Sequence, residues 1–538
     1  MSPIIPILAA LPFLAATVFG QGALTPPGAP APMMKTLDQL EARTPIGTPG
    51  QVTTGTITIS SPGSYVLMGP VTVASGTAIQ INASDVTLDL NGFTITSTNP
   101  AASGYGIFIN GNLMDVTVRN GHIRGQATYA NETYSGGGFA YGVRVLATAN
   151  VRISDLSLRG LPSYGIYTAG TDPSIVSNCQ AYIIGGDAIY ATTVMNCAAN
   201  TCGGRGIIAT TVINCKATST ASAHAIHGAE VFNSQGSSIS GAGIYASDRA
   251  IGSYGSSTSG CGIEAPVAID CKGTSGSNTG VKAIYMASRC MGLSSTATGL
   301  YSQIADACRA SNAGDATTIA LTATTASNCH VNAALDGTGI SASCVQNCCV
   351  IASGSGKAIN STGTIANCFA QSNTATAING NIVRDCYASS NGGGSAIVAS
   401  TAMGCYAYSL GTNTTLYATK ASDCHGVNAS SGCGLYATDI AENCLGSSGS
   451  GIGLDCEGTA MNCKGSSSSN IGLYCLAAAT NCQGRSTSGT YGIYVQGTAT
   501  NCRGYRPGGI ALYAYIAIGC IASSGTISTS NPYNMPTP

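Results

Sequence analysis

The stretch ATNCQGRSTSGTYGIYVQGTATNCRG, residues 479–504, repeats the phrase A-T-N-C-x-G after 20 residues. The same cysteine, or a serine in its place, recurs nineteen times with a step of 18 to 21 residues. This Cys column comprises positions 179, 197, 215, 234, 253, 271, 290, 308, 329, 348, 368, 386, 405, 424, 444, 463, 482, 502 and 520. So regular a step over many turns is typical of a solenoid, in which each unit stacks only on its neighbours.

Further columns keep step with the Cys column. Three residues before it, every turn carries Ala, Val or Ile, and two residues after it seventeen turns carry Ala or Gly. Eighteen turns carry Ile or Leu at a further position, eight or nine residues before the Cys column. In the coil of Cys290 this residue is Ile284, six residues before the cysteine. No segment between the columns shows the i, i+3, i+4, i+7 pattern of a helix, so each turn must be built from short strands. We predict an all-β fold, a right-handed parallel β-helix with coils of about 19 residues in its C-terminal part.

The residue before the Cys column is Asn in eleven turns, Asp in three and Gly in three. These residues tolerate left-handed backbone geometry, which predicts a bend between two strands. Stacked Asn amides can hydrogen-bond along the column, and Cys, a small hydrophobe, fills the interior just past the bend. The predicted structural ladder is represented by Asn196 and Cys197, Asn214 and Cys215, Asn443 and Cys444, Asn462 and Cys463, Asn481 and Cys482, and Asn501 and Cys502.

The earlier part of the chain, residues 51–178, has longer strands and longer loops. Its phrases SPGSYVL (61–67), INASDVTLDLNGFTI (81–95) and DVTVRNGHIRG (115–125) resemble the opening coils of secreted bacterial right-handed parallel β-helix proteins, the pectin-lyase-like superfamily. The resemblance implies lyases and hydrolases of acidic polysaccharides, which use Asp clusters holding calcium beside a basic residue, or two to three carboxylates. The motifs N-T-D, D-D, G-H-G and R-I-K that would carry those residues are absent. The resemblance therefore supports the fold and weakens an enzymatic function.

One charged neighbourhood in these early coils is a candidate catalytic site. Aligning VTLDLNG with VTVRNG stacks Asp89 on Arg119 one coil later, which predicts an outward ion pair worth about 0 to 1 kcal/mol. The alternative function is a polysaccharide lyase or glycoside hydrolase, with calcium as cofactor for the lyase only. Long loops at 97–105 and 124–140 would wall its groove. Its catalytic residues would be Asp89, Arg119, His122 and Asp155, with Arg124 nearby.

The 24 cysteines all lie within residues 179–520. An even number in an exported chain is compatible with disulfides. However, stacked residues keep their Cβ atoms about 4.8 Å apart, whereas a disulfide needs about 3.8 Å. We expect buried thiols, with bridges only where a coil deviates, for instance at Cys344, Cys348 and Cys349.

No metal site is predicted. Cys348 and Cys349 are adjacent rather than spaced as zinc ligands, and His330 and His425 follow the Cys column on the outward phase. His224 and His227, in the phrase HAIH, are expected to point to opposite faces of a strand.

Tyrosine often follows the Ile/Leu column, in a phase that places it on the surface. These residues are Tyr190, Tyr245, Tyr285, Tyr301, Tyr417, Tyr436, Tyr474, Tyr494 and Tyr513. The last three fall on consecutive coils and form the Tyr strip, which we predict to bind sugar rings or another protein. Cross-strand stacking that only stabilises the sheet is the alternative.

Composition and segment patterns complete the prediction. Residues 1–20 have the length and apolar character of a secretory signal peptide, with a lipid-facing anchor as the alternative. Residues 21–50 are expected to form a Pro/Gly-rich linker with a short capping helix, Met33 to Ala42. Residues 51–178 form the early coils, 179–525 the Cys-column coils and 526–538 a C-terminal tail. With 8% charged residues and a net charge of -1, the chain lacks the electrostatic footprint of a nucleic-acid partner, and no later stretch is apolar enough for a transmembrane segment.

We therefore expect a secreted or cell-surface, non-catalytic β-helix without cofactors. It would act as a structural, adhesive or carbohydrate-binding element, with a polysaccharide or cell-surface partner or by self-association. Ice or mineral binding is a weaker alternative, because the repeated phrase ATTV at 191–194 and 209–212 is not continued on the next turn.

Overall fold

The structure, a computed structural model, describes residues 42–168, 173–314 and 317–533. The chain divides into the units Met1–Thr44 and Pro45–Pro538, and the second unit contains the solenoid. The predicted signal peptide and all but the last residue of the predicted capping helix lie outside the described residues. Within those residues no helix occurs, and hence none that could span a membrane.

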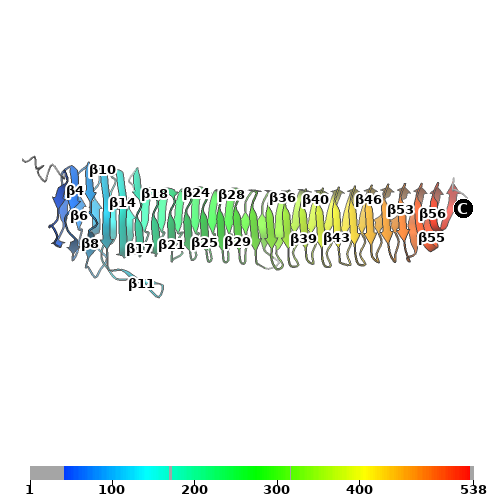
Figure 1. Ribbon diagram of the computed structural model, residues 1–538, viewed down its shortest axis with the longest axis horizontal. Coiled ribbons are helices and arrows are strands. Elements are labelled where there is room, and N and C mark those ends of the chain that lie inside the picture. Colours follow the sequence, from blue (N-terminus) through cyan, green and yellow to red (C-terminus); the bar gives the residue numbers. More distant parts are fainter. Residues whose placement is uncertain (1–41, 169–172, 315–316, 534–538) are drawn as a thin grey trace, which may run out of the picture. The chain divides into compact units, whose positions relative to one another are not determined.

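The second unit is a parallel β-solenoid of about 25 turns. Hydrogen bonds join 54 strands into one continuous sheet that winds along the unit, as Figure 1 shows. Inside the stack, strands pair in parallel with the equivalent strands one coil before and one coil after them. The predicted all-β coil architecture is thereby confirmed. Its right-handed sense stays a prediction, supported by the strong preference of parallel strand connections for that hand.

Each coil has three faces, which are separate strands in the coil of residues 454–467. The first face is β48 (Leu454–Cys456), the second β49 (Thr459–Met461) and the third β50 (Lys464–Ser467). In the next coil they pair with β51 (Leu473–Cys475), β52 (Ala478–Thr480) and β53 (Gln483–Ser486). In many other coils the first two faces belong to one bent strand, such as β18 (Ile189–Met195).

The remaining third-face strands matter for the site. From the Cys column onward they are β17 (Gln180–Ile184), β19 (Ala198–Cys202), β21 (Lys216–Ser219), β23 (Gln235–Ser238), β25 (Tyr254–Ser257), β27 (Lys272–Ser275), β29 (Met291–Ser294), β32 (Arg309–Asn312), β35 (His330–Ala333), β37 (Cys349–Ala352), β39 (Phe369–Ser372), β41 (Tyr387–Ser390), β43 (Tyr406–Ser409), β45 (His425–Asn428), β47 (Leu445–Ser448), β55 (Arg503–Ile518) and β56 (Ile521–Tyr533).

The interior is a stack of small and branched apolar side chains. In the coil of residues 454–467, Leu454 of the first face, Ala460 of the second face and Cys463 at the bend are completely buried. Equivalent residues line up coil after coil, so the hydrophobic core runs the length of the solenoid. Burial of apolar surface in every coil is the main stabilising contribution.

The residue before the Cys column adopts a left-handed conformation in all nineteen turns, with φ between 48° at Asn233 and 61° at Gly252. Asn amides also bond along the column. The side chain of Asn462 donates to Asn443, and that of Asn481 donates to Asn462, each over 3.2 Å. This column therefore turns the chain between the second and third faces.

The early coils are wider. Strand β10 (Met114–Arg124) pairs with β7 (Val86–Asp89) and β8 (Thr94–Ser97) before it, and with β14 (Ala149–Leu161) after it. The loop that follows β10 forms a separate hairpin of β11 (Thr128–Ala130) and β12 (Thr133–Ser135).

Two details of the sequence prediction are wrong. Ile284 is not part of the interior but is 41% exposed, and Val281, nine residues before Cys290, is fully buried in its place. A bulge in β28 (Val281–Ser288) explains this, since it holds Ile284 and Tyr285 out of register with the preceding coil. Residues 526–533, predicted as a tail, continue strand β56, which pairs with β55 as far as Tyr533.

Candidate ligand-binding groove

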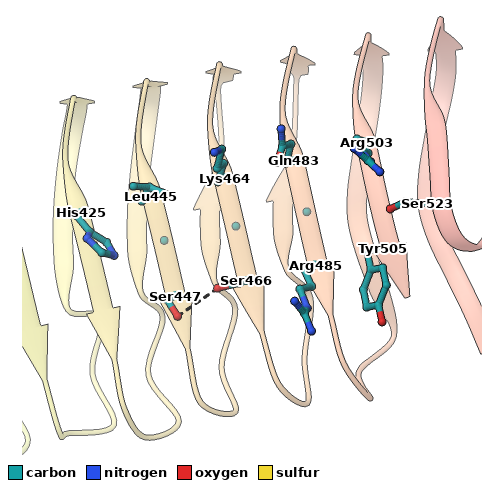
Figure 2. Close-up of a pocket in the computed structure, with 13 residues that line it drawn as sticks. His425, Leu445, Ser447, Lys464, Ser466, Gln483, Arg485, Arg503, Tyr505 and Ser523 are labelled. Atoms are coloured by element: carbon teal, nitrogen blue, oxygen red, sulfur yellow. Dashed lines mark hydrogen bonds between the residues drawn. The ribbon is translucent and has the colours of Figure 1, made fainter. Parts of the chain in front are cut away.

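The third face is hollowed near its C-terminal end. A groove of about 480 Å³ crosses six successive coils there (Figure 2). Its lining comprises His425, Leu445, Gly446, Ser447, Lys464, Gly465, Ser466, Gln483, Gly484, Arg485, Arg503, Tyr505 and Ser523.

Strand register arranges these side chains in two parallel rows. The first row consists of residues that pair from coil to coil, in the order His425, Leu445, Lys464, Gln483 and Arg503. Ser447, Ser466, Arg485 and Tyr505 form the second row, two residues further along each strand. Because side chains alternate along a strand, both rows point outward. Equivalent positions on neighbouring coils lie about 4.8 Å apart.

The inward residue between the rows is glycine, for example Gly465. A Cβ atom on Gly465 would lie 2.1 Å from the carbonyl oxygen of Gly472, at the start of the first face of the next coil. The backbones of the third and first faces therefore approach too closely for any side chain. This close approach fixes the floor of the groove.

The groove is positively charged. Its lining contains Lys464, Arg485 and Arg503 but no Asp or Glu. These three cations are exposed, and no ion pair in the described part of the chain involves them. Arg485 lies over the ring of Tyr505, with its Cζ atom 4.9 Å from the ring centroid, which holds the guanidinium in place.

This absence of carboxylates extends over the whole face. From β17 to β55, no third-face strand contains Asp or Glu. Several cations of the other faces do have acidic partners: Lys282 bonds Glu264 at 2.8 Å on the first face, and Arg289 bonds Asp270 at 2.6 Å at the bend. The third face therefore presents cations without acidic partners of the kind that Lys282 and Arg289 have.

Aromatic rings continue the groove along the same row. Phe369 stacks on Tyr387 with ring centroids 5.3 Å apart, and Tyr387 on Tyr406 at 5.1 Å. His425 meets Tyr406 edge to face at 5.1 Å and connects the rings to the groove. Burial lowers the pKa of His425 from 6.5, which favours the neutral ring.

The predicted Tyr strip lies on the first face. Tyr474 stacks on Tyr494 with centroids 5.5 Å apart, and Tyr494 on Tyr513 at 4.8 Å, with interplanar angles of 3° and 11°. The rings are half-buried by one another. The strip is therefore a continuous surface of rings, but it is separate from the groove.

The predicted charged neighbourhood of the early coils is partly assembled. Arg119 pairs with Asp89 one coil earlier, with a 3.3 Å contact between Nη2 and Oδ2. The prediction of an outward pair is wrong for Asp89, which is only 6% exposed and also accepts hydrogen bonds from the Asn91 backbone and the Asn120 side chain. These bonds fix the end of a strand and leave the carboxylate little access to a substrate.

His122 and Asp155 share a shallow hollow of about 360 Å³, which Asp89 and Arg119 do not line. Asp155 has a left-handed φ of 55° and accepts a hydrogen bond from Asn178 one coil later, as the bend residues of the later coils do. The four residues of the catalytic alternative thus do not form one site.

All 24 cysteines are thiols in the structure, including Cys344, Cys348 and Cys349. In the Cys column the thiol donates to the carbonyl two residues before it, as Cys463 does to Met461 at 3.2 Å. Burial raises the pKa of other thiols, for example that of Cys261 to about 11. The column is an inert core element.

The expectation for His224 and His227 is wrong. Both rings contact Tyr245, with centroids 5.0 Å and 4.9 Å away, and lie on one side of the coil. His224 precedes β22 (Ile226–Phe232), so strand alternation does not apply to it. Within the described residues, no group of three or more His, Cys, Asp or Glu could hold a metal ion.

The inward columns of the sequence do not reveal the groove. The sequence signal of the groove is the position directly after the Cys column. From Gln180 to Ile521 this position is never Asp or Glu, and near the C-terminal end it is occupied by Lys464, Gln483 and Arg503. A fold is needed to show that this position faces solvent and that these side chains are neighbours.

The strand pairings define the class of protein, a parallel β-helix repeat protein. No protein-family model matches the chain, and no curated protein matches it. A solved structure, the A-module of a mannuronan C-5 epimerase from Azotobacter vinelandii, aligns over 88% of this chain and 92% of its own, with 10% identity and a TM-score of 0.18. This loose alignment carries no argument about activity.

Proposed function

We propose that the protein is an exported, non-catalytic β-helix that binds an acidic polysaccharide along its third face. The apolar segment of residues 1–20 supports export. The single observation that carries the binding proposal is the groove of Lys464, Arg485 and Arg503. Among the described residues these three cations have no ion-pair partner, and the third-face strands from β17 to β55 contain no Asp or Glu.

An extended polyanion fits this arrangement. Lys464 and Arg503 lie in one row two coils apart, which places them about 10 Å from each other along the solenoid. Arg485 lies between them in the second row, so a chain with an anionic group on each sugar would meet a cation on successive coils. The adjoining rings from Phe369 to His425 offer stacking surfaces for a longer chain.

Catalysis is not part of this proposal. The groove contains no carboxylate that could act as acid, base or calcium ligand, and Asp89 in the early coils is held by Arg119 and Asn120. The proposed binding function therefore needs no cofactor.

Binding of purified protein to polyuronate, a sulfated glycan and single-stranded DNA tests the proposal. We expect binding to the acidic glycans that weakens as salt rises from 50 to 300 mM, because salt screens exposed charges. The variant K464Q/R485Q/R503Q should lose about tenfold or more, since each charged contact is worth about 0.5 to 1 kcal/mol.

The matched control is Lys420→Gln, which removes a cation that faces Asp439 on another face. It should bind like the unaltered protein. Equal affinity of the triple variant and the unaltered protein, or preference for DNA, would rule out the proposed function.

A further inference from the structure

A carboxylate interrupts the row of tyrosines on the first face. Asp455 in β48 pairs with Tyr436 in β46 (Leu435–Glu442) on one side and with Tyr474 in β51 on the other. Tyr436 stacks on Tyr417 of β44 (Leu416–Ser422), with ring centroids 5.2 Å apart. Asp455 thus occupies the place of a ring between two groups of stacked rings.

Asp455 is incompletely satisfied. Its Oδ1 atom is buried and has no hydrogen-bond partner in the part of the chain that the structure describes. The neighbouring polar groups have partners, since Tyr436 donates to Glu457 and Gln496 donates to Tyr474 over 2.8 Å. A buried carboxylate oxygen without a donor is costly. The residue as a whole is only half-buried, so a ligand that brings a donor to the accessible side of the carboxyl group is favoured at this position.

The surroundings of Asp455 select the ligand. The first-face positions of six successive coils, termed the first-face strip, are Tyr417, Tyr436, Asp455, Tyr474, Tyr494 and Tyr513. The strip contains no Lys or Arg, and the carboxyl groups of Asp455 and Glu457 repel anions. Aromatic rings favour the apolar faces of sugar rings, and a half-buried carboxylate accepts a sugar hydroxyl on its accessible side.

We propose that the first-face strip binds a neutral, hydroxyl-rich polysaccharide, with Asp455 accepting a hydroxyl of the sugar that sits between Tyr436 and Tyr474. The strip spans five coil steps, or about 24 Å, which suits an extended chain of several sugars. This site is independent of the basic groove. With both sites occupied, one molecule connects a neutral polymer to an acidic one.

The proposed contact is sensitive to pH. Burial, with a contribution from the charge of Glu457, raises the pKa of Asp455 to about 6. The titratable groups that face it are Glu457, Tyr436, Tyr474 and Cys433. The ionised carboxylate is the stronger acceptor, so binding should be tighter above pH 6 than below it.

The proposal is tested by calorimetry with the full chain. Its affinity for soluble β-glucan, xylan and galactomannan is measured at pH 5.0 and at pH 7.5. We expect at least one of them to bind about tenfold more tightly at pH 7.5, the gain of a hydrogen bond to a charged group. Asp455→Asn should abolish this pH dependence, and Tyr474→Ala should abolish binding. Asp439→Asn, an exposed carboxylate beside Lys420, and Tyr285→Ala, an exposed ring in the bulge of β28, are controls that should change nothing.

The groove variant K464Q/R485Q/R503Q separates the two proposals, because it should bind the neutral glycan normally. Absence of binding to every neutral glycan, unchanged affinity of Tyr474→Ala, or a pH dependence that survives in Asp455→Asn would each overturn the inference. Circular dichroism of Asp455→Asn and Tyr474→Ala must match that of the unaltered protein.

Discussion

The side-chain amide of Asn481 donates a hydrogen bond to Oδ1 of Asn462, one coil earlier, over 3.2 Å. Both residues have a left-handed φ, of 53° and 54° respectively. One side chain thus meets two requirements of the fold at once, since it tolerates the bend and links neighbouring coils.

Replacing Asn481 separates these two roles. Asn481→Ala should destabilise the protein by about 1 to 2 kcal/mol, because Ala pays for the left-handed conformation and loses the amide bond. Asn481→Gly should cost less, since glycine adopts this conformation freely. Urea unfolding midpoints of the two variants check the order, and an equal loss for both would contradict the conformational argument.

Gly465 should be intolerant of any side chain. In Gly465→Ala the new Cβ would meet the carbonyl oxygen of Gly472 at 2.1 Å, so the two faces must separate. Overpacking of this kind costs about 1 to 3 kcal/mol and should also weaken polyanion binding at the groove. Gly393→Ala is the matched control, since nothing lies within 4 Å of its Cβ position. Thermal unfolding and polyuronate affinity are measured for both variants. Equal values for Gly465→Ala and Gly393→Ala would contradict the predicted intolerance of Gly465.

Asp455 should make stability depend on pH. Folding raises its pKa from 3.8 to about 6, so the folded state binds the proton more tightly and loses stability as the pH rises from 4 through 6. Asp455→Asn should therefore stabilise the protein by about 1 to 3 kcal/mol at pH 7.5 and by almost nothing at pH 4. Urea midpoints at the two pH values measure this, and a uniform effect at both would contradict it.

Thiol reactivity should follow burial. Cys344 and Cys349 are partly exposed, whereas Cys463 and Cys482 are fully buried. In native protein we expect a maleimide to label the first two in minutes and the last two only in denaturant, because the reagent cannot reach a fully buried thiol. Mass spectrometry of digested samples identifies the labelled residues, and early modification of Cys482 would show that the interior opens.

Asp89 should prove structural. Asp89→Asn removes the ion pair with Arg119 and weakens two hydrogen bonds, so a loss of about 1 to 3 kcal/mol is expected. Incubation of the unaltered protein with acidic polysaccharides, with and without calcium, should release neither unsaturated products nor reducing ends. Release that Asp89→Asn abolishes would instead establish the catalytic alternative.

The coil architecture could be predicted because it is written in a one-dimensional repeat. The Cys column, the Ile/Leu column and the Asn bend recur with one step, and each is satisfied by contacts with the next coil alone. The errors fell where a local irregularity broke the step, as at the bulge that exposes Ile284 and the loop that places His224 beside His227. A repeat gives no information about such insertions.

The candidate sites were less predictable. The Tyr strip was visible because it follows a conspicuous inward column, but Lys464, Arg485 and Arg503 occupy two different outward positions and appear as scattered charges in the sequence. Asp455 appears as one more acidic residue, and only its place between Tyr436 and Tyr474 makes its carboxyl group unusual.

The sequence by itself determined that the chain is a solenoid, where each coil turns and which residues fill its interior, since those properties depend on neighbours at a fixed step. Only the tertiary structure decided which outward residues share a surface. That choice depends on the strand register across coils, which brings Lys464 and Arg503 into one row although 38 residues separate them in the sequence, and which buries Oδ1 of Asp455 without a partner. Binding chemistry requires several side chains to converge in space, and the fold alone supplies that convergence.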